Sequence, residues 1–276
     1  MPAIEQTETV GAESEGYDSG HDEASIPPSS LDKFKSDLER FRLRRSTPDR
    51  STKNLSPAKR QRTSTQYAPP SKYAHLSPLT DIMEPSLICV FVGFNPGVMT
   101  STSGHAYAHP SNSFWKLLHS SGCTDVRLKP EQDVDLPRLY SMGNTNIVAR
   151  PSKNAAELSK EESAAGTPIL EEKIRKFRPE AVCVVGKGIW ESIWRWRYRR
   201  AIKKDEFKYG WQDEKENMGK SDDWSGAKVF VATATSGLAA NLKPHEKEAI
   251  WLPFGQWVRQ RREERAQELT TMHGIA

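Results

Sequence analysis

The feature that most constrains the fold is an uninterrupted apolar run from Leu87 to Val92, which ends at Gly93. A run of this length, rich in β-branched residues and followed by glycine and proline, is typical of a buried central strand in a parallel sheet. Two later runs, 181–186 and 229–233, have the same character, and helical patterns separate them. Strands that alternate with helices predict an α/β fold around a short, mainly parallel central sheet.

A single polar side chain, Asn95, stands directly after the first strand, in the turn Gly93-Phe94-Asn95-Pro96-Gly97. Open α/β sheets bind ligands at the carboxyl ends of their strands, so a site is expected here. Glycine permits a tight turn and proline stiffens it, which would hold the amide in one position. Asparagine before Pro-Gly also commonly caps its own turn. From this pentapeptide alone, that structural role is the better interpretation.

Helix signals follow in an order that suits this fold. Ser111 or Asn112 can cap a helix that carries Phe114, Trp115, Leu117 and Leu118 and ends at Gly122. Ser159 begins a capping box, and its helix is expected to be most regular over 169–177. Further helices are predicted from Lys187 onward and from about Pro244 to Leu269.

Charge and hydropathy divide the chain into a compact domain with charged extensions. Residues 1–30 contain seven acidic residues and no Lys or Arg, whereas eleven basic residues lie between 33 and 62. The mean hydropathy of −0.71 is low for a fully packed chain. These observations predict a disordered tail over 1–78 (acidic over 1–30, basic over 31–65), a domain over 79–262 with a solvated insertion loop over 195–226, and a charged tail over 263–276. A DNA-contacting role for the insertion is the less favoured alternative.

Several classes of protein are excluded by composition. No apolar run is long enough to span a membrane or to form a secretory signal, so we expect a soluble, intracellular protein. The three cysteines lack the spacing of metal ligands and are expected to be buried thiols, so no metal and no cofactor is predicted. Residues 57–62 resemble a short nuclear-localisation signal, which predicts the nucleus. A basic arm also suits nucleic-acid phosphates, although charge alone favours a merely solvated tract equally.

Several motifs together resemble one known family. These motifs are Gly93–Gly97, the segment from Tyr107 to Lys116, and Ser236-Gly237-Leu238. In this order they resemble the mismatch-specific uracil/thymine DNA glycosylases of the uracil-DNA glycosylase superfamily, roughly from Ser86 to Trp257, and most closely a eukaryotic, fungal-like member. The resemblance implies a three-layer α/β/α sandwich. It also implies a monofunctional hydrolase of N-glycosyl bonds that removes uracil, and less efficiently mismatched thymine or related damaged pyrimidines, and so initiates base excision repair.

The resemblance further assigns roles to individual residues. Asn95 would orient the attacking water, because an amide cannot act as a general base at neutral pH. With the neighbouring motifs present, this catalytic role is favoured over turn capping. The target base would be flipped out of the helix and held by stacking and hydrogen bonds. The residues implied for base binding are Phe94, Tyr107 and Asn146, and those implied for DNA binding are Gly97, Lys187, Ser236, Gly237 and Leu238.

The chain departs from the family pattern just after Leu238. Many relatives carry an arginine there, whereas this chain has Ala239-Ala240. Leu238 would fill the space that the flipped base leaves, but it cannot read the partner base through hydrogen bonds. Selectivity is therefore expected to follow how easily each base pair opens. Thr100, five residues past Asn95, is expected to crowd the methyl group of thymine.

Two functions from different classes remain open at this point. The first is a DNA glycosylase that acts as a monomer on double-stranded and single-stranded DNA, without a membrane partner. The second is a non-catalytic binder of damaged DNA or chromatin that uses the same cleft and the basic arm. Asn95 favours the enzyme, because a pure binder needs no amide at the water site. An ordinary nucleotide-binding domain is less favoured because Gly-x-Gly-x-x-Gly is missing, and the spacing around Lys187 is not that of a P-loop.

Overall fold

A computed structural model describes residues 67–272. Most of the predicted N-terminal tail, including the basic segment at 57–62, therefore lies outside the described residues, as do residues 273–276. No helix within 67–272 combines the length and apolar character that crossing a membrane requires.

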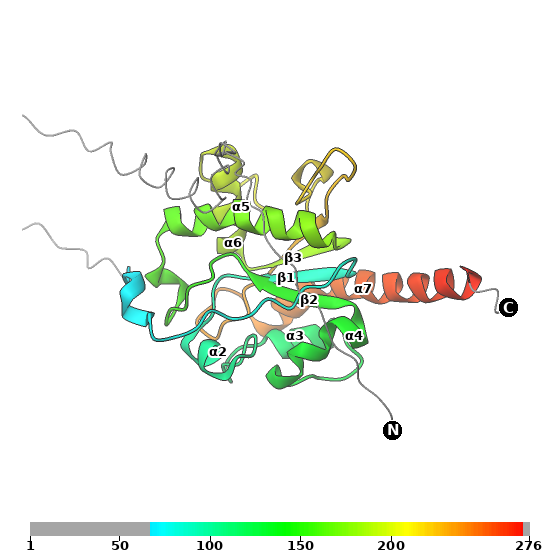
Figure 1. Cartoon of the computed structure of the whole chain (residues 1–276), viewed down its shortest axis with the longest axis horizontal. Helices are drawn as coiled ribbons and strands as arrows, with labels where there is room; N and C mark the ends of the chain where they lie inside the picture. The colour runs from blue at the N-terminus through cyan, green and yellow to red at the C-terminus, as the bar shows by residue number, and fades with distance from the viewer. Residues whose placement is uncertain (1–66, 273–276) are drawn as a thin grey trace, which may run out of the picture. The chain divides into compact units, whose positions relative to one another are not determined.

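A five-stranded sheet forms the centre of the domain, in the order β2-β1-β3-β5-β4 (Figure 1). Its strands are β1 (Cys89–Gly93), β2 (Met142–Asn146), β3 (Ala181–Val185), β4 (Gly210–Trp211) and β5 (Lys228–Ala232). Four strands run parallel, and β1 is buried along its whole length, which confirms the predicted central strand. The antiparallel strand β4 at the edge has two residues, too few to leave a periodic signal in the sequence.

Helices cover both faces of the sheet (Figure 1). On one face lie α5 (Lys160–Phe177) and α6 (Lys187–Tyr198); on the other lie α3 (Phe114–Ser120), α4 (Leu136–Tyr140) and α7 (Pro244–Met272). Alternate residues of a strand point to opposite faces, so Phe91 joins the core beneath α3 and α7 while Val92 joins the core beneath α5 and α6. Burying such a side chain contributes about 1.5–3 kcal/mol. The predicted α/β/α sandwich is confirmed.

The predicted start of α5 is also confirmed, with one difference. The Ser159 hydroxyl accepts a hydrogen bond from the Glu162 backbone N–H at 3.0 Å, as an N-cap does. The Glu162 carboxylate, however, pairs with Arg150 instead of completing the capping box. Helix α5 is thereby tied to the segment that follows β2.

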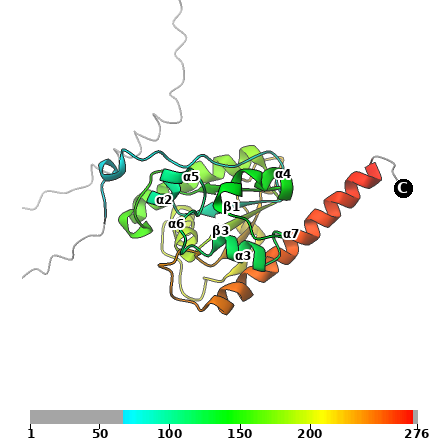
Figure 2. The same cartoon turned by 90° about the horizontal axis from the view of Figure 1, so that it is seen from below.

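The folded chain extends beyond the predicted domain boundaries at 79 and 262. Residues 70–73 form the 3-10 helix η1 (Pro70–Tyr73), and the Ala68 backbone N–H donates to the Glu157 carbonyl at 3.0 Å. Helix α7 continues to Met272, and Figure 2 shows its second half extending past the rest of the domain. Within that half, Arg265 pairs with Glu180. These polar contacts depend on distant partners, so local hydropathy does not reveal them.

The segment 195–226 is a packed region and not the fully solvated loop that its composition predicts. Arg197 bonds the Glu171 carboxylate at 2.6 Å and the Glu216 carboxylate at 3.1 Å. Glu216 is buried, and so is Met218. A buried carboxylate such as Glu216 requires a partner of this kind, and the Arg197–Glu171 pair joins the segment to α5.

Candidate active site

The sheet brings the predicted site residues to one edge. Asn95 follows β1, Asn146 ends β2, Lys187 follows β3 and the Ser236–Leu238 segment follows β5. Since all four strands are parallel, these positions share the carboxyl edge of the sheet, where open α/β folds bind ligands.

Three acceptors hold the side-chain amide of Asn95. Its Nδ2 donates to Ser152 Oγ at 2.9 Å, to the Arg150 carbonyl at 3.1 Å and to the Pro96 carbonyl at 3.3 Å. The Ser152 hydroxyl donates its own proton to the Asn154 carbonyl at 2.7 Å, so toward Asn95 it can only accept. Because every partner is an acceptor, the amino group must face them. No donor within residues 67–272 bonds Oδ1, which leaves this carbonyl available to water or a ligand.

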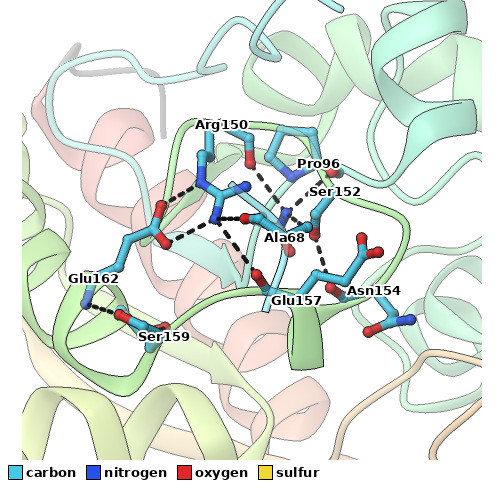
Figure 3. Close-up of polar contacts among 10 residues, drawn as sticks. Ala68, Pro96, Arg150, Ser152, Asn154, Glu157, Ser159 and Glu162 are labelled. Atoms are coloured by element: carbon cyan, nitrogen blue, oxygen red, sulfur yellow. Dashed lines mark hydrogen bonds and ion pairs between the residues drawn. The ribbon is translucent and has the colours of Figure 1, made fainter. Parts of the chain in front are cut away.

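Charged contacts fix the segment that holds Asn95, as Figure 3 shows. Arg150 forms a two-point ion pair with Glu162, through Nε and through Nη2 at 2.9 Å. The hydrogen bonds that Arg150 donates to the Glu162 carboxylate raise the pKa of Arg150. Paired donors of this kind fix direction as well as distance. The same Nη2 also donates to the Ala68 carbonyl at 3.0 Å.

Tyr107 and Asn146 face each other across Gly93. A Cβ atom added at Gly93 would lie 2.5 Å from Asn146 Oδ1 and 3.2 Å from the Tyr107 hydroxyl, so only glycine fits between them. No residue within 67–272 bonds the Asn146 side chain, and the buried Tyr107 hydroxyl likewise has no partner there. An unpaired buried hydroxyl costs about 1–3 kcal/mol, which a ligand could recover.

The ring of Tyr107 is tightly constrained. It stacks on Phe114 with ring centroids 3.8 Å apart and planes 12° apart, so one face of the ring is covered. Its backbone φ of 54° lies in the left-handed region, which is uncommon for a bulky residue and often marks a functional position. Burial raises the pKa of Tyr107, so the phenol stays protonated and can donate a hydrogen bond.

Phe94, the third predicted base-binding residue, packs on the face of the sheet that α5 and α6 cover, whereas Tyr107 packs on the other face. The Phe94 ring approaches Gly188 at the start of α6, where a Cβ atom would be 3.5 Å away, and it packs on the core beneath α5 and α6. Its carbonyl accepts from the Val148 N–H at 2.9 Å, which fixes the backbone beside Asn95.

The Ser236–Leu238 segment forms an exposed projection beside this edge. A Cβ atom at Gly237 would lie 2.3 Å from Ser111 Oγ, so glycine allows the segment to pack closely on the loop before α3. The Leu238 side chain is 78% exposed, the highest value among the large apolar residues of the described chain. Leu238 is therefore accessible to a partner.

The two remaining predicted DNA contacts are also at this edge. Gly97 precedes the short helix α2 (Val98–Ser103), and a Cβ atom there would meet nothing within 4 Å, so its backbone is open to approach. Lys187 lies 4.5 Å from the Phe207 ring centroid and 3.8 Å from the Glu191 carboxylate. The insertion therefore reaches the start of α6.

A cavity of about 190 Å³ adjoins the Ser236–Leu238 segment. Its lining includes Ser111, Ser113, Ser236, Lys116, Lys247 and Glu248. Lys116 pairs with the Glu248 carboxylate at 3.0 Å, and Lys247 Nζ donates to the Ala239 carbonyl at 2.8 Å. Hydroxyls and amines are donors that suit an anionic ligand such as a phosphate group. By contrast, no three His, Cys, Asp or Glu side chains within 67–272 are arranged to hold a metal ion.

Sequence reasoning missed the residues that orient Asn95. Ser152, Arg150 and Glu162 act through long-range contacts, and no spacing rule links them to a turn more than fifty residues earlier. The sequence analysis named Asn146 from the preceding strand, but nothing in it placed residues 150–162 beside the Asn95 turn.

Comparison with known proteins finds a family whose model matches this chain and a curated protein of similar sequence. The family model described as the uracil DNA glycosylase superfamily matches residues 81–254. A G/U mismatch-specific uracil DNA glycosylase from Schizosaccharomyces pombe (strain 972 / ATCC 24843) is 38% identical over 187 residues, which cover 65% of this chain and 54% of that protein. The chain thus spans about half the length of the curated relative that it matches.

Proposed function

The chain belongs to the uracil DNA glycosylase superfamily, and from this membership we propose that it is a monofunctional DNA glycosylase that releases uracil from DNA. The membership confirms the family that the motifs predicted. The relative from S. pombe is named for G/U mismatches, which supports uracil opposite guanine as the preferred substrate here. The observation that carries the proposal is the Asn95 amide, whose nitrogen is fully engaged and whose carbonyl is free.

In the proposed reaction, Asn95 Oδ1 accepts a hydrogen bond from a water molecule near the anomeric carbon of the flipped nucleotide. An amide is too weak a base to remove the proton early, so its contribution is to position the water. The N-glycosidic bond breaks through an oxocarbenium-like sugar, and uracil departs as an anion that hydrogen-bond donors stabilise. Water then adds to the sugar and loses its proton to solvent.

The space beside Gly93 is the proposed base site. A pyrimidine edge needs both donors and acceptors, and the free amide of Asn146 offers both. The unpaired Tyr107 hydroxyl supplies a further donor at the same place, and the Tyr107 ring provides aromatic surface. The backbone around Phe94 is proposed to donate to a base carbonyl. Thr100 is buried in α2 and is the residue proposed to disfavour the methyl group of thymine.

The Ser236–Leu238 segment is the proposed contact with the duplex. Leu238 would enter the gap left by the flipped base, as apolar wedges do, and the hydroxyl- and lysine-lined cavity would receive a neighbouring phosphate. Gly97 and Lys187 would add phosphate contacts. We further propose that the protein acts as a monomer in the nucleus, on single-stranded as well as double-stranded DNA, in base excision repair.

The competing function is a binder of damaged DNA or chromatin that performs no chemistry. Incubation of the full chain with duplexes that contain U·G, T·G or U·A, followed by cleavage of the abasic products, distinguishes the two. The proposed enzyme releases uracil from U·G fastest, from U·A more slowly and thymine from T·G more slowly still. Binding of all three duplexes without release of any base would contradict it.

A further inference from the structure

Residues 67–73, here called the strap, lie against the 150–157 loop that holds Asn95 (Figure 3). The Ala68 N–H donates to the Glu157 carbonyl at 3.0 Å, and the Ala68 carbonyl accepts from Arg150 Nη2 at 3.0 Å. Ala68 is buried, although it belongs to a segment that hydropathy predicts to be a tail. Its two backbone groups are thus satisfied by the two ends of this loop.

The Glu157 carboxylate joins the strap to the loop at a second point. It accepts hydrogen bonds from Lys72 Nζ at 2.6 Å and from the Tyr73 hydroxyl at 2.8 Å, both on the strap. It also accepts from the Lys153 backbone N–H at 2.9 Å, within the loop. Glu157 is only 7% exposed, and a buried carboxylate without such partners would be strongly unfavourable.

The loop between these contacts has little regular structure of its own. Between the end of β2 at Asn146 and the short 3-10 helix η3 (Ala155–Glu157), its backbone bonds, within residues 67–272, only the turn after β1. The N–H groups of Ile147, Val148 and Ser152 donate to the carbonyls of Gly93, Phe94 and Pro96. It nevertheless supplies the Arg150 carbonyl and the Ser152 hydroxyl that orient the Asn95 amide. These backbone bonds lie on the side of the Asn95 turn, and the contacts of Ala68, Lys72 and Tyr73 hold the loop on its other side.

We propose that the strap is a positioning element of the active site, which acts through Glu157 and Arg150 to keep the acceptors of Asn95 in place. This inference rests on the proposed function. Lys72 and Glu157 touch neither the base nor the attacking water, so they are positioning residues and not catalytic ones. A strap that merely stabilised the fold would affect substrate binding and catalysis together, or neither.

The test uses the full chain and single-turnover release of uracil from a U·G duplex. Lys72→Gln removes the strap side of the contact, and Glu157→Gln removes the loop side. Each variant is expected to slow base release at saturating protein about 10-fold, because small misplacement of a reacting group costs this much or more. Duplex affinity is expected to stay within about 2-fold. Lys72→Arg, which keeps a cationic donor, is expected to retain most of the rate.

Lys160→Gln provides a matched control. Lys160 is exposed at the start of α5 and carries the same charge, but it has no contact with the strap among the described residues. Its replacement is expected to leave the rate unchanged. The control thereby separates loss of the strap contact from a general loss of positive charge near the DNA.

A double-mutant comparison shows whether the effect passes through Asn95. In an Asn95→Ala background, Lys72→Gln is expected to reduce the residual rate by less than about 2-fold, since coupled residues are not additive. An equal loss in both backgrounds, or wild-type rates for Lys72→Gln and Glu157→Gln, would overturn the strap inference. A wild-type chain that releases no base from any duplex would instead contradict the proposed function itself.

Discussion

The side-chain nitrogen of Asn95 lies 2.9 Å from the hydroxyl oxygen of Ser152, across 57 positions of sequence. Ser152 is completely buried, and its own proton is already donated to the Asn154 carbonyl. In this hydrogen bond Asn95 can therefore only be the donor, so its amino group faces Ser152 and its carbonyl points elsewhere. The orientation on which the proposed chemistry depends is fixed before any substrate arrives.

Replacing Ser152 by alanine is expected to weaken that orientation. Asn95 would keep only the Arg150 and Pro96 carbonyls, and the loss of one such hydrogen bond costs about 0.5–1.5 kcal/mol. We expect uracil release to slow about 3- to 10-fold with little change in duplex affinity. Single-turnover kinetics measure this, with Ser152→Thr as the hydroxyl-preserving control; identical rates for Ala and Thr would argue against a role for the hydroxyl.

Leu238→Ala tests the proposed wedge. Only a duplex has a gap to fill when the base leaves the stack, so this truncation is expected to slow release from U·G duplexes much more than from single-stranded DNA. Because Leu238 is exposed, the change is not expected to affect folding. Parallel assays on the two substrates measure the ratio. Equal losses on both would make Leu238 part of the base pocket instead.

The strap should respond to pH in a defined direction. The hydrogen bond from Lys72 lowers the pKa of Glu157 to about 2, so this carboxylate is more acidic in the folded protein than in an unfolded chain. Its stabilising contribution is thus present above the ordinary pKa of a glutamate and is lost as the pH falls toward 2.

Hydrogen exchange of residues 67–73 can measure that response. Corrected for intrinsic rates, exchange is expected to be slow and constant from pH 8 to about pH 5 and faster only in more acidic solution. Glu157→Gln is expected to show the fast exchange already at neutral pH. Protection that survives in the Gln variant would mean that the carboxylate does not hold the strap.

Two truncations separate the strap from the charged tail before it. Deletion of residues 1–66 is expected to preserve the rate of uracil release at low salt while weakening non-specific DNA binding and its salt dependence. Deletion of residues 1–78 removes the strap as well and is expected to slow base release in addition. If both truncations release uracil at the same rate, residues 67–78 are not needed for base release. The boundary near Leu79 that hydropathy predicts would then mark the start of the catalytic unit.

The sequence predicted the parts of this protein that local patterns encode. The apolar run before Gly93 and its two counterparts specify buried parallel strands, and parallel strands place whatever follows them at one edge. For that reason Asn95 could be placed at the carboxyl edge of the sheet without coordinates, whereas Asn146 and Lys187 were assigned through the resemblance to the family.

The parts that escaped prediction depend on contacts between distant polar groups. The Ala68–Glu157 bond and the Arg197–Glu216 pair join segments whose composition indicates loops or tails, and the Arg150–Glu162 pair joins a loop to the start of α5. Hydrophobic periodicity carries no information about such partners. The sequence could therefore name Asn95 as the central residue, but not the loop and strap that orient it.

The most direct test of the account is single-turnover release of uracil from a U·G duplex by Asn95→Ala, with duplex affinity measured on the same preparation. Since Asn95 is proposed to contact water and not the base, the variant is expected to bind the duplex as tightly as the wild type. Its rate is expected to fall at least about 100-fold, which is the scale of a misplaced reactant. Near-normal release by Asn95→Ala would contradict the proposed role of Asn95.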